Sequence, residues 1–231
     1  MTAPPATPSA PSAASPPAGD RPRDLFGLYK PVFQDWWDGL TDAANDHTNP
    51  QRGPLARLRR LGIYDSPTGP LPDVATALSE GAFQHLYKAV RGRQPRAEEG
   101  GKRLSDDQEE SLVVVAATLA HVRGHRPGRT AALLGGPEDG PPRLLAEARF
   151  LRLMRVETAA ELMDQARRLV ALLGREAPVG DLGASLFLWR VLPKVRRDWA
   201  RSYYGLDLAG HGAAKPGPIP PSQDAPEPGA A

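Results

Sequence analysis

The chain has no cysteine among its 231 residues, which excludes several kinds of chemistry together. Disulfides, Cys-ligated zinc, iron–sulfur clusters and thiol nucleophiles all require that side chain. No apolar run approaches the roughly 20 residues that a membrane-spanning helix needs. The first residues contain no apolar stretch of the kind found in secretory signals. We therefore expect a cytoplasmic protein that makes no membrane contact.

The signatures of common catalytic sites are also missing. The sequence contains no glycine-rich phosphate loop, no GxSxG and no HExxH. His121 and His125 are four residues apart, but the glycine and proline around them predict that a helix ends there, so we interpret them as polar residues at a helix end. The acidic residues within 106–110 suit a helix N-terminus. We expect a protein that is not an enzyme and that has no metal site and no cofactor.

Large apolar residues are scarce at both ends of the chain, where much of its proline lies. Residues 1–23 and 206–231 are rich in Pro, Ala and Gly. Such segments bury too little apolar surface to offset the entropy of ordering them. We predict two disordered tails, 1–23 and 206–231, around a single helical domain at 24–205.

The first half of that domain reads as helices separated by Gly/Pro loops. Apolar residues at helical spacing predict helices at 31–46, 54–62 and 72–91. Trp36 and Trp37 lie on the apolar stripe of the first helix, which favours packing over stacking on bases. Ser105 and Gln108 have the spacing of a capping box, and the apolar run 112–122 after them predicts a buried helix.

The second half shows the clearest periodicity. Residues 124–142 are rich in Gly, Pro and Arg, with room for a short helix at 130–134. Helices are predicted at 143–156 and at 159–173, the latter preceded by a second capping box and ended by Gly174. A last helix at 182–204 must be kinked or divided by Pro193. Because no alternating strand pattern occurs, we predict an all-α fold, a compact helical bundle.

Positive charge is unevenly distributed, although the formal net charge is only +2. Residues 52–103 contain ten Lys or Arg against five Asp or Glu, and residues 143–205 contain twelve against seven. Most of these cations are arginines, whose planar guanidinium binds phosphate oxygens with two hydrogen bonds. The pattern indicates phosphate-binding helical faces, with an ordinary solvated surface as the alternative reading.

Five segments in a fixed order resemble the CasB family, the small subunit of type I-E CRISPR Cascade complexes. They are the Trp-Trp pair at 36–37, RGPLARLRRL at 52–61, ARFLRLMR at 148–155, ARRLVALL at 166–173, and LFLW with RRDWARSYYG within 186–205. Together they span most of 31–205.

The resemblance implies a non-catalytic scaffold in antiviral defence. It implies two copies, as a homodimer, inside a complex with the other Cascade subunits, the guide RNA and the target DNA. The expected role is to stabilise the guide–target hybrid and to hold the displaced single strand. Matching the basic positions of the family gives the expected nucleic-acid-binding residues: Arg59, Arg60, Arg149, Arg152, Arg155, Arg167 and Arg168.

Three other readings stay open. A helical adaptor or regulator that binds only protein would use the Trp36/Trp37 face and the acidic first helix, and would show no salt-sensitive nucleic-acid binding. A small enzyme acting on nucleic acid would need a convergent catalytic site. A helix-turn-helix regulator would discriminate between DNA sequences.

Overall fold

Helices account for almost all regular structure in the residues described by the computed structural model, which are 24–45, 52–62, 73–94, 103–136 and 142–206. Ten helices and one pair of two-residue strands occur in these ranges. The predicted all-α class is confirmed. The two predicted tails lie outside the described residues, except for Leu206.

The N-terminal helices are α1 (Leu25–Asn45), α2 (Arg52–Arg60), α3 (Val74–Leu78) and α4 (Gly81–Arg93). The prediction of one helix over 72–91 is wrong, because the segment forms α3 and α4. Glu80 has extended backbone angles (φ −93°, ψ 120°) and separates the two helices. The Asp73 side chain caps α3 by accepting a 3.0 Å hydrogen bond from the Thr76 N–H.

The central helix α5 (Asp106–Leu119) begins at the predicted capping box. The Ser105 side chain accepts a hydrogen bond from the Gln108 N–H, and the Gln108 side chain accepts one from the Ser105 N–H. Every residue from Ser111 to Leu119 is buried, so the apolar run is a buried helix as predicted. It is followed by β1 (Gly124–His125) and the short helix α6 (Thr130–Gly135).

The C-terminal part contains α7 (Glu147–Met154), α8 (Ala159–Leu172), β2 (Glu176–Ala177), α9 (Val179–Leu188) and α10 (Pro193–Tyr203). Helix α7 is shorter than predicted. The apolar stripe of α8 is buried, and Thr158 caps this helix by accepting from the Glu161 N–H. Pro193 is the first residue of α10, where a missing N–H costs nothing, so the predicted division at this proline is confirmed.

The two strands were not predicted. Gly124 pairs with Glu176 and His125 with Ala177, in parallel. The pair joins the segment after α5 to the segment after α8, and it is too short to leave an alternating pattern in the sequence.

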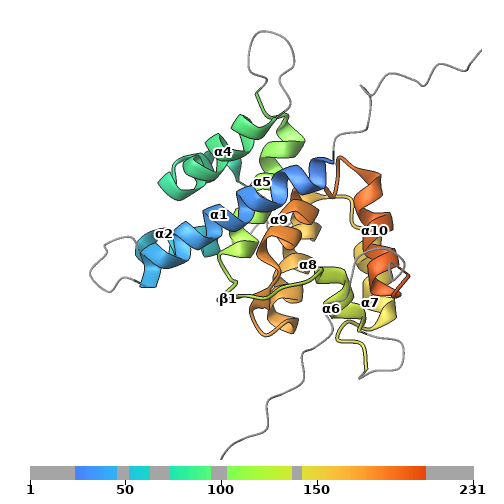
Figure 1. Ribbon diagram of the computed structural model, residues 1–231. Coiled ribbons are helices and arrows are strands. Elements are labelled where there is room, and N and C mark those ends of the chain that lie inside the picture. The colour runs from blue at the N-terminus through green and yellow to red at the C-terminus, as the bar shows by residue number, and fades with distance from the viewer. Residues whose placement is uncertain (1–23, 46–51, 63–72, 95–102, 137–141, 207–231) are drawn as a thin grey trace, which may run out of the picture.

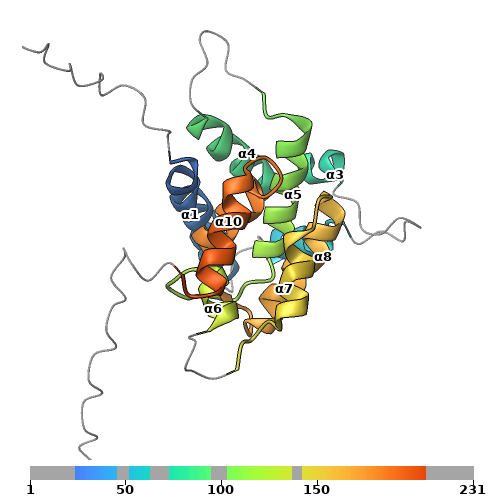
Figure 2. The same ribbon diagram turned by 90° about the vertical axis from the view of Figure 1, so that its right-hand side faces the viewer.

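Helix α1 crosses the core helices α5 and α9 (Figure 1). It approaches α9 closely because that helix presents glycines: a Cβ at Gly180 would lie 2.6 Å from the Lys30 carbonyl oxygen, and one at Gly183 would lie 2.7 Å from the Phe33 Cβ. The Phe187 ring packs edge-on against Tyr29, with ring centroids 4.9 Å apart. Helix α8 packs against α5, and α6 packs against α10 (Figure 2).

No helix in the described part of the chain combines the length and the apolar character that a membrane-spanning segment requires.

Candidate nucleic-acid interface

Three of the predicted arginines lie on the outer side of α7. Arg149, Arg152 and Arg155 are exposed, whereas Phe150 and Leu153 on the opposite side are buried. A rise of about 1.5 Å per residue separates successive arginines by about 4.5 Å along the helix axis. None of the three side chains forms an ion pair or hydrogen bond within the described structure. We call these three side chains the α7 arginine face.

Aromatic packing holds α7 in place. The Phe150 ring stacks on Tyr203 of α10, with centroids 3.8 Å apart and ring planes 3° from parallel. The Tyr203 hydroxyl donates a 2.6 Å hydrogen bond to the Leu145 carbonyl oxygen. The Tyr204 hydroxyl donates to Glu147 at 2.8 Å. At the other end of α7, the Arg196 side chain donates to the Met154 carbonyl oxygen at 3.4 Å. Because both ends of α7 are thus fixed to α10 and its following turn, the α7 arginine face is carried by a rigid support.

Two other predicted arginines bind carbonyl oxygens at helix ends. The Arg59 Nε donates to the Ala120 carbonyl oxygen at 2.6 Å, where α5 ends. The Arg167 Nη2 donates to the carbonyl oxygens of Arg59 (3.3 Å) and Leu61 (2.5 Å), where α2 ends. Burial lowers the pKa of both guanidiniums from its usual value. These side chains satisfy carbonyls that helix ends leave open, and their contact with nucleic acid stays a prediction.

The remaining two predicted arginines are exposed on other helices. Arg60 lies at the end of α2. Arg168 on α8 pairs with Asp164, one turn earlier, at 2.9 Å. The structure therefore brings three of the seven arginines onto one helix face and distributes the other four over α2 and α8.

A half-buried histidine lies where α5, α2 and α8 meet. Burial, and then the charges of Arg167, Arg59 and Arg175, lower the pKa of His121 from 6.5 to about 4. Its Nε2 is buried and has no hydrogen-bond partner. Sequence reasoning missed this cationic cluster, because the arginines around His121 come from distant segments. His125 is instead an exposed residue of β1, and within the described ranges no three His, Asp or Glu side chains form a metal-binding group.

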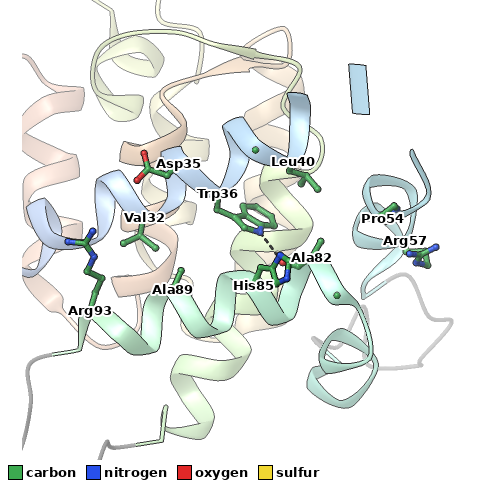
Figure 3. Close-up of a pocket in the computed structure, with 12 residues that line it drawn as sticks. Val32, Asp35, Trp36, Leu40, Pro54, Arg57, Ala82, His85, Ala89 and Arg93 are labelled. Carbon is green, nitrogen blue, oxygen red and sulfur yellow. Dashed lines mark hydrogen bonds between the residues drawn. The ribbon is translucent and has the colours of Figure 1, made fainter. Parts of the chain in front are cut away.

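The two adjacent tryptophans of α1 have different surroundings. Trp37 is buried in the core, 5 % exposed. Trp36 lines a groove of about 980 Å³ between α1 and α4, and its indole N–H donates to the Ala82 carbonyl oxygen at 2.9 Å (Figure 3). Both rings pack against the protein, in the way that their position on the apolar stripe predicted.

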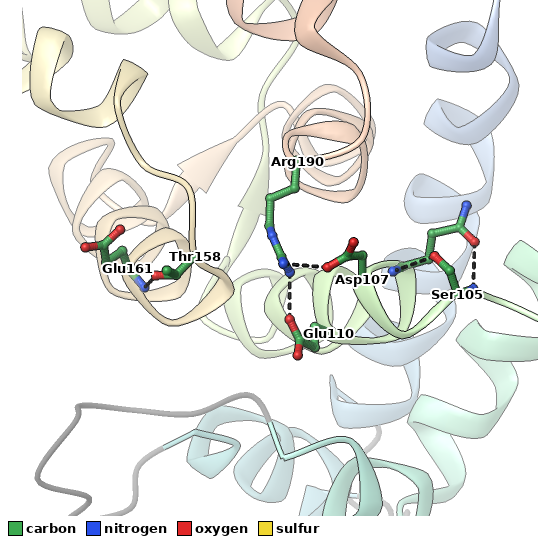
Figure 4. Close-up of polar contacts among 7 residues, drawn as sticks. Ser105, Asp107, Glu110, Thr158, Glu161 and Arg190 are labelled. Atoms are coloured by element: carbon green, nitrogen blue, oxygen red, sulfur yellow. Dashed lines mark hydrogen bonds and ion pairs between the residues drawn. The ribbon is translucent and has the colours of Figure 1, made fainter.

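The acidic residues at the start of α5 take part in structural contacts. Arg190, just after α9, reaches Asp107 at 2.5 Å and Glu110 at 2.6 Å (Figure 4). Glu109 is buried and accepts a 2.9 Å hydrogen bond from the Tyr87 hydroxyl. These carboxylates hold α4, α5 and α9 together and do not converge on an open site.

Comparison with known proteins identifies one family. The model of the family described as CRISPR-associated protein Cse2 matches residues 54–204, well over half of the chain. Helix α1 and its Trp-Trp pair precede the matched range, whereas the α7 arginine face lies inside it. No curated protein and no solved structure matches the chain. The chain thus belongs to the Cse2 family, the small subunits of CRISPR Cascade complexes.

Proposed function

We propose that this subunit stabilises the hybrid of guide RNA and target DNA, and holds the displaced DNA strand, by contacting phosphates with the α7 arginine face. The observation that carries the proposal is the exposure of Arg149, Arg152 and Arg155, without any intramolecular partner in the described structure, on a helix fixed by the Phe150–Tyr203 stack. A guanidinium without a carboxylate partner keeps all its donors available for phosphate oxygens.

Such a role needs charge and shape but no catalytic group. In RNA-guided complexes, base pairing between guide and target reads the sequence, and the protein contacts the backbone. A displaced single strand is followed by a positive surface without contacts to particular bases. Arg60 and Arg168 supply further exposed charge on α2 and α8. We also propose that the subunit acts in the cytoplasm as a homodimer within the complex.

Assembly is tested by co-expressing the chain with its chromosomal neighbours and a CRISPR array. We expect it in a large RNA-containing particle at about two copies, since the resemblance to the family implies two. Recovery of the chain alone, or with one protein and no RNA, would contradict the proposal and would favour the protein-only adaptor.

The interface is tested in that particle with the triple variant Arg149→Ala/Arg152→Ala/Arg155→Ala. The salt slope is the slope of the logarithm of the binding constant against the logarithm of the salt concentration. For single-stranded DNA its magnitude falls by about 0.7 for each phosphate contact that is lost, so we expect a reduction of about 2. The matched control is the triple lysine variant, which keeps three charges and should keep most of the slope. An unchanged slope in the alanine variant would exclude the α7 arginine face and leave Arg60 and Arg168 as the first positions to examine.

A further inference from the structure

Arginines from distant segments gather where α2 and α5 end. The Arg59 Nε donates to the Ala120 carbonyl oxygen at 2.6 Å, directly before His121 in the chain. Arg167 of α8 reaches the same place, because its Nη2 donates to the Arg59 and Leu61 carbonyl oxygens. Each of these bonds ties a guanidinium to a helix end, so the fold itself sets the positions of these side chains.

The strand pair adds two exposed arginines to this place. The Arg123 N–H donates to the Arg175 carbonyl oxygen at 2.8 Å, next to the pairing of β1 with β2. Burial, and then the charges of Arg123 and Arg175, lower the pKa of Arg59. Neither exposed side chain forms an ion pair or hydrogen bond within the described residues. We call the following side chains the cationic cluster: Arg59, His121, Arg123, Arg167 and Arg175.

The carboxylates around the cationic cluster do not neutralise it. Burial lowers the pKa of Arg167, and the charge of Asp164 offsets this only in part, because the Asp164 carboxylate pairs with Arg168 at 2.9 Å. Glu176 on β2 is exposed and forms no ion pair in the described part of the chain. Two nitrogens of the cluster, Arg167 Nε and His121 Nε2, are buried and lack a hydrogen-bond partner. Positive charge therefore exceeds negative charge here, and a bound anion would reduce the repulsion.

The backbone of Arg175 supplies an independent observation. This residue has a φ of 67°, and it is the only residue other than glycine with a positive φ in the described ranges. Its N–H donates to the Val170 carbonyl oxygen at 2.9 Å, which fixes this conformation at the end of α8. A glycine would adopt it without the steric cost that a Cβ brings. Residues held in this way are concentrated at sites that bind ligands.

We propose that the cationic cluster binds one phosphate dianion, either free inorganic phosphate or the terminal phosphate of a nucleotide, through the guanidiniums of Arg59, Arg123 and Arg175. Arg59 uses only its Nε on Ala120, so its other nitrogens are available to the anion. Guanidiniums bind phosphate oxygens with paired hydrogen bonds. Arg167 acts through its charge, and His121 takes up a proton more readily once the anion is bound.

The excess of positive charge favours a dianion over a phosphate inside a nucleic-acid strand. A phosphate monoester carries close to two negative charges near neutral pH, whereas a phosphodiester carries one. The α7 arginine face contributes no residue to the cationic cluster, so this proposal does not rest on the proposed function. A variant that loses one kind of binding can keep the other.

Calorimetric titration of the full-length protein with inorganic phosphate tests the site. Near neutral pH we expect one phosphate per chain, with a dissociation constant on the order of millimolar or lower. Thymidine monophosphate presents the same dianion on a nucleotide, and a thymidine dinucleotide without a terminal phosphate presents one internal diester. Tighter binding of thymidine monophosphate than of phosphate would identify a nucleotide end as the ligand, and the reverse order would identify the free anion. Dinucleotide binding as tight as that of phosphate would overturn the proposal, as would no binding of either dianion.

Two double variants separate this site from general attraction to positive charge. Arg123→Ala/Arg175→Ala should weaken phosphate binding at least tenfold. Arg126→Ala/Arg197→Ala removes the same charge from exposed positions outside the cationic cluster and should change the affinity less than twofold. An equal loss of affinity in both double variants would overturn the proposal.

The variant Arg175→Gly should change stability and binding in opposite directions. Glycine removes the strained positive φ, so we expect a higher melting temperature in phosphate-free buffer. The same variant should bind phosphate several-fold more weakly, and its stability keeps this loss from being attributed to unfolding. Phosphate affinity equal to that of the natural chain would overturn the proposal.

His121 reports on the bound anion without being replaced. Sulfate serves as the probe, because it keeps two negative charges between pH 4 and 7, where phosphate itself takes up a proton. The pKa of His121, about 4 in the free chain, is lowered by burial and by the charges of Arg167, Arg59 and Arg175. In saturating sulfate we expect NMR titration to show a pKa above about 5, which corresponds to at least tenfold tighter binding by the protonated form. The exposed His125 should not shift, and an unchanged pKa of His121 would overturn the proposal.

Discussion

The guanidinium of Arg167 on α8 donates a 2.5 Å hydrogen bond to the carbonyl oxygen of Leu61, 106 residues earlier in the chain. It donates a second one to the Arg59 carbonyl oxygen at 3.3 Å. The bond joins two elements that the sequence places in different halves of the domain. It also gives an arginine that was expected to bind nucleic acid a role within the fold.

Replacing this arginine should mainly reduce stability. Arg167→Ala leaves two half-buried carbonyls without their donor, and we expect it to lower the free energy of unfolding by about 2 kcal/mol. Arg168→Ala is the matched control, because its exposed pair with Asp164 should contribute less than about 0.5 kcal/mol. Urea denaturation measures both. A stable Arg167→Ala protein with a reduced salt slope for DNA would show instead that Arg167 contacts phosphate.

His121 should make stability sensitive to acid. The pKa of His121 is about 4 in the folded chain, whereas an unperturbed histidine, as in the unfolded chain, has a pKa of 6.5. The unfolded chain therefore binds the proton more readily. The stability contributed by neutral His121 is therefore present above pH 6.5 and is lost as the pH falls toward 4, up to roughly 3 kcal/mol.

The comparison of His121→Gln with the natural chain isolates this effect. Between pH 6.5 and 4, the variant should lose less stability in urea denaturation than the natural chain does. His125→Gln, at the exposed position in β1, should follow the natural chain. Parallel curves for all three proteins would exclude His121 as the source of the acid sensitivity.

The same substitution at two glycines should have opposite effects. A Cβ at Gly135 would lie 2.0 Å from the Tyr203 carbonyl oxygen, so Gly135→Ala must displace α6 from α10. We expect a loss of about 3 kcal/mol or more. Gly39→Ala, inside α1 with open space around it, should gain roughly 0.5–1 kcal/mol. Thermal unfolding measures both, and a Gly135→Ala protein as stable as the natural chain would contradict the close contact.

Arg190 should be coupled more strongly to Glu110 than to Asp107. The Arg190 side chain is 19 % exposed and reaches both carboxylates, whereas the Asp107 side chain is 61 % exposed and that of Glu110 only 40 %. Double-mutant cycles with alanine should give about 1 kcal/mol or more for Arg190 with Glu110, and less for Arg190 with Asp107. Arg190→Lys should also be destabilising, because a lysine cannot contact two carboxylates as a planar fork does. Equal coupling energies would contradict this ranking.

Local signals explain which helices could be predicted. Ser105 and Gln108 cap α5 through neighbouring residues alone, and the apolar stripe of α8 follows directly from helical spacing. The break at Glu80 was missed because apolar periodicity continues across it. The strands β1 and β2 were missed because they pair two residues across a separation of 52 positions.

The candidate site was also only partly predictable, because local patterns do not show contacts between distant segments. Residues spaced three apart on α7 share a broad face, so the sequence alone could place Arg149, Arg152 and Arg155 together. Whether an arginine points outward or binds a carbonyl depends on tertiary packing. Arg59 and Arg167 are held by the ends of α5 and α2, and no local pattern around either residue indicates this.

The packing of α1 on α9 has a consequence for synthesis on the ribosome. Tyr29 and Phe33 complete their contacts only with Phe187, about 150 residues later in the chain. At 5–20 residues per second, α1 waits roughly 8–30 s for its partner helix. During that interval the aromatic side chains that α9 will cover are exposed on the nascent chain, so α1 is translated long before it is fully protected.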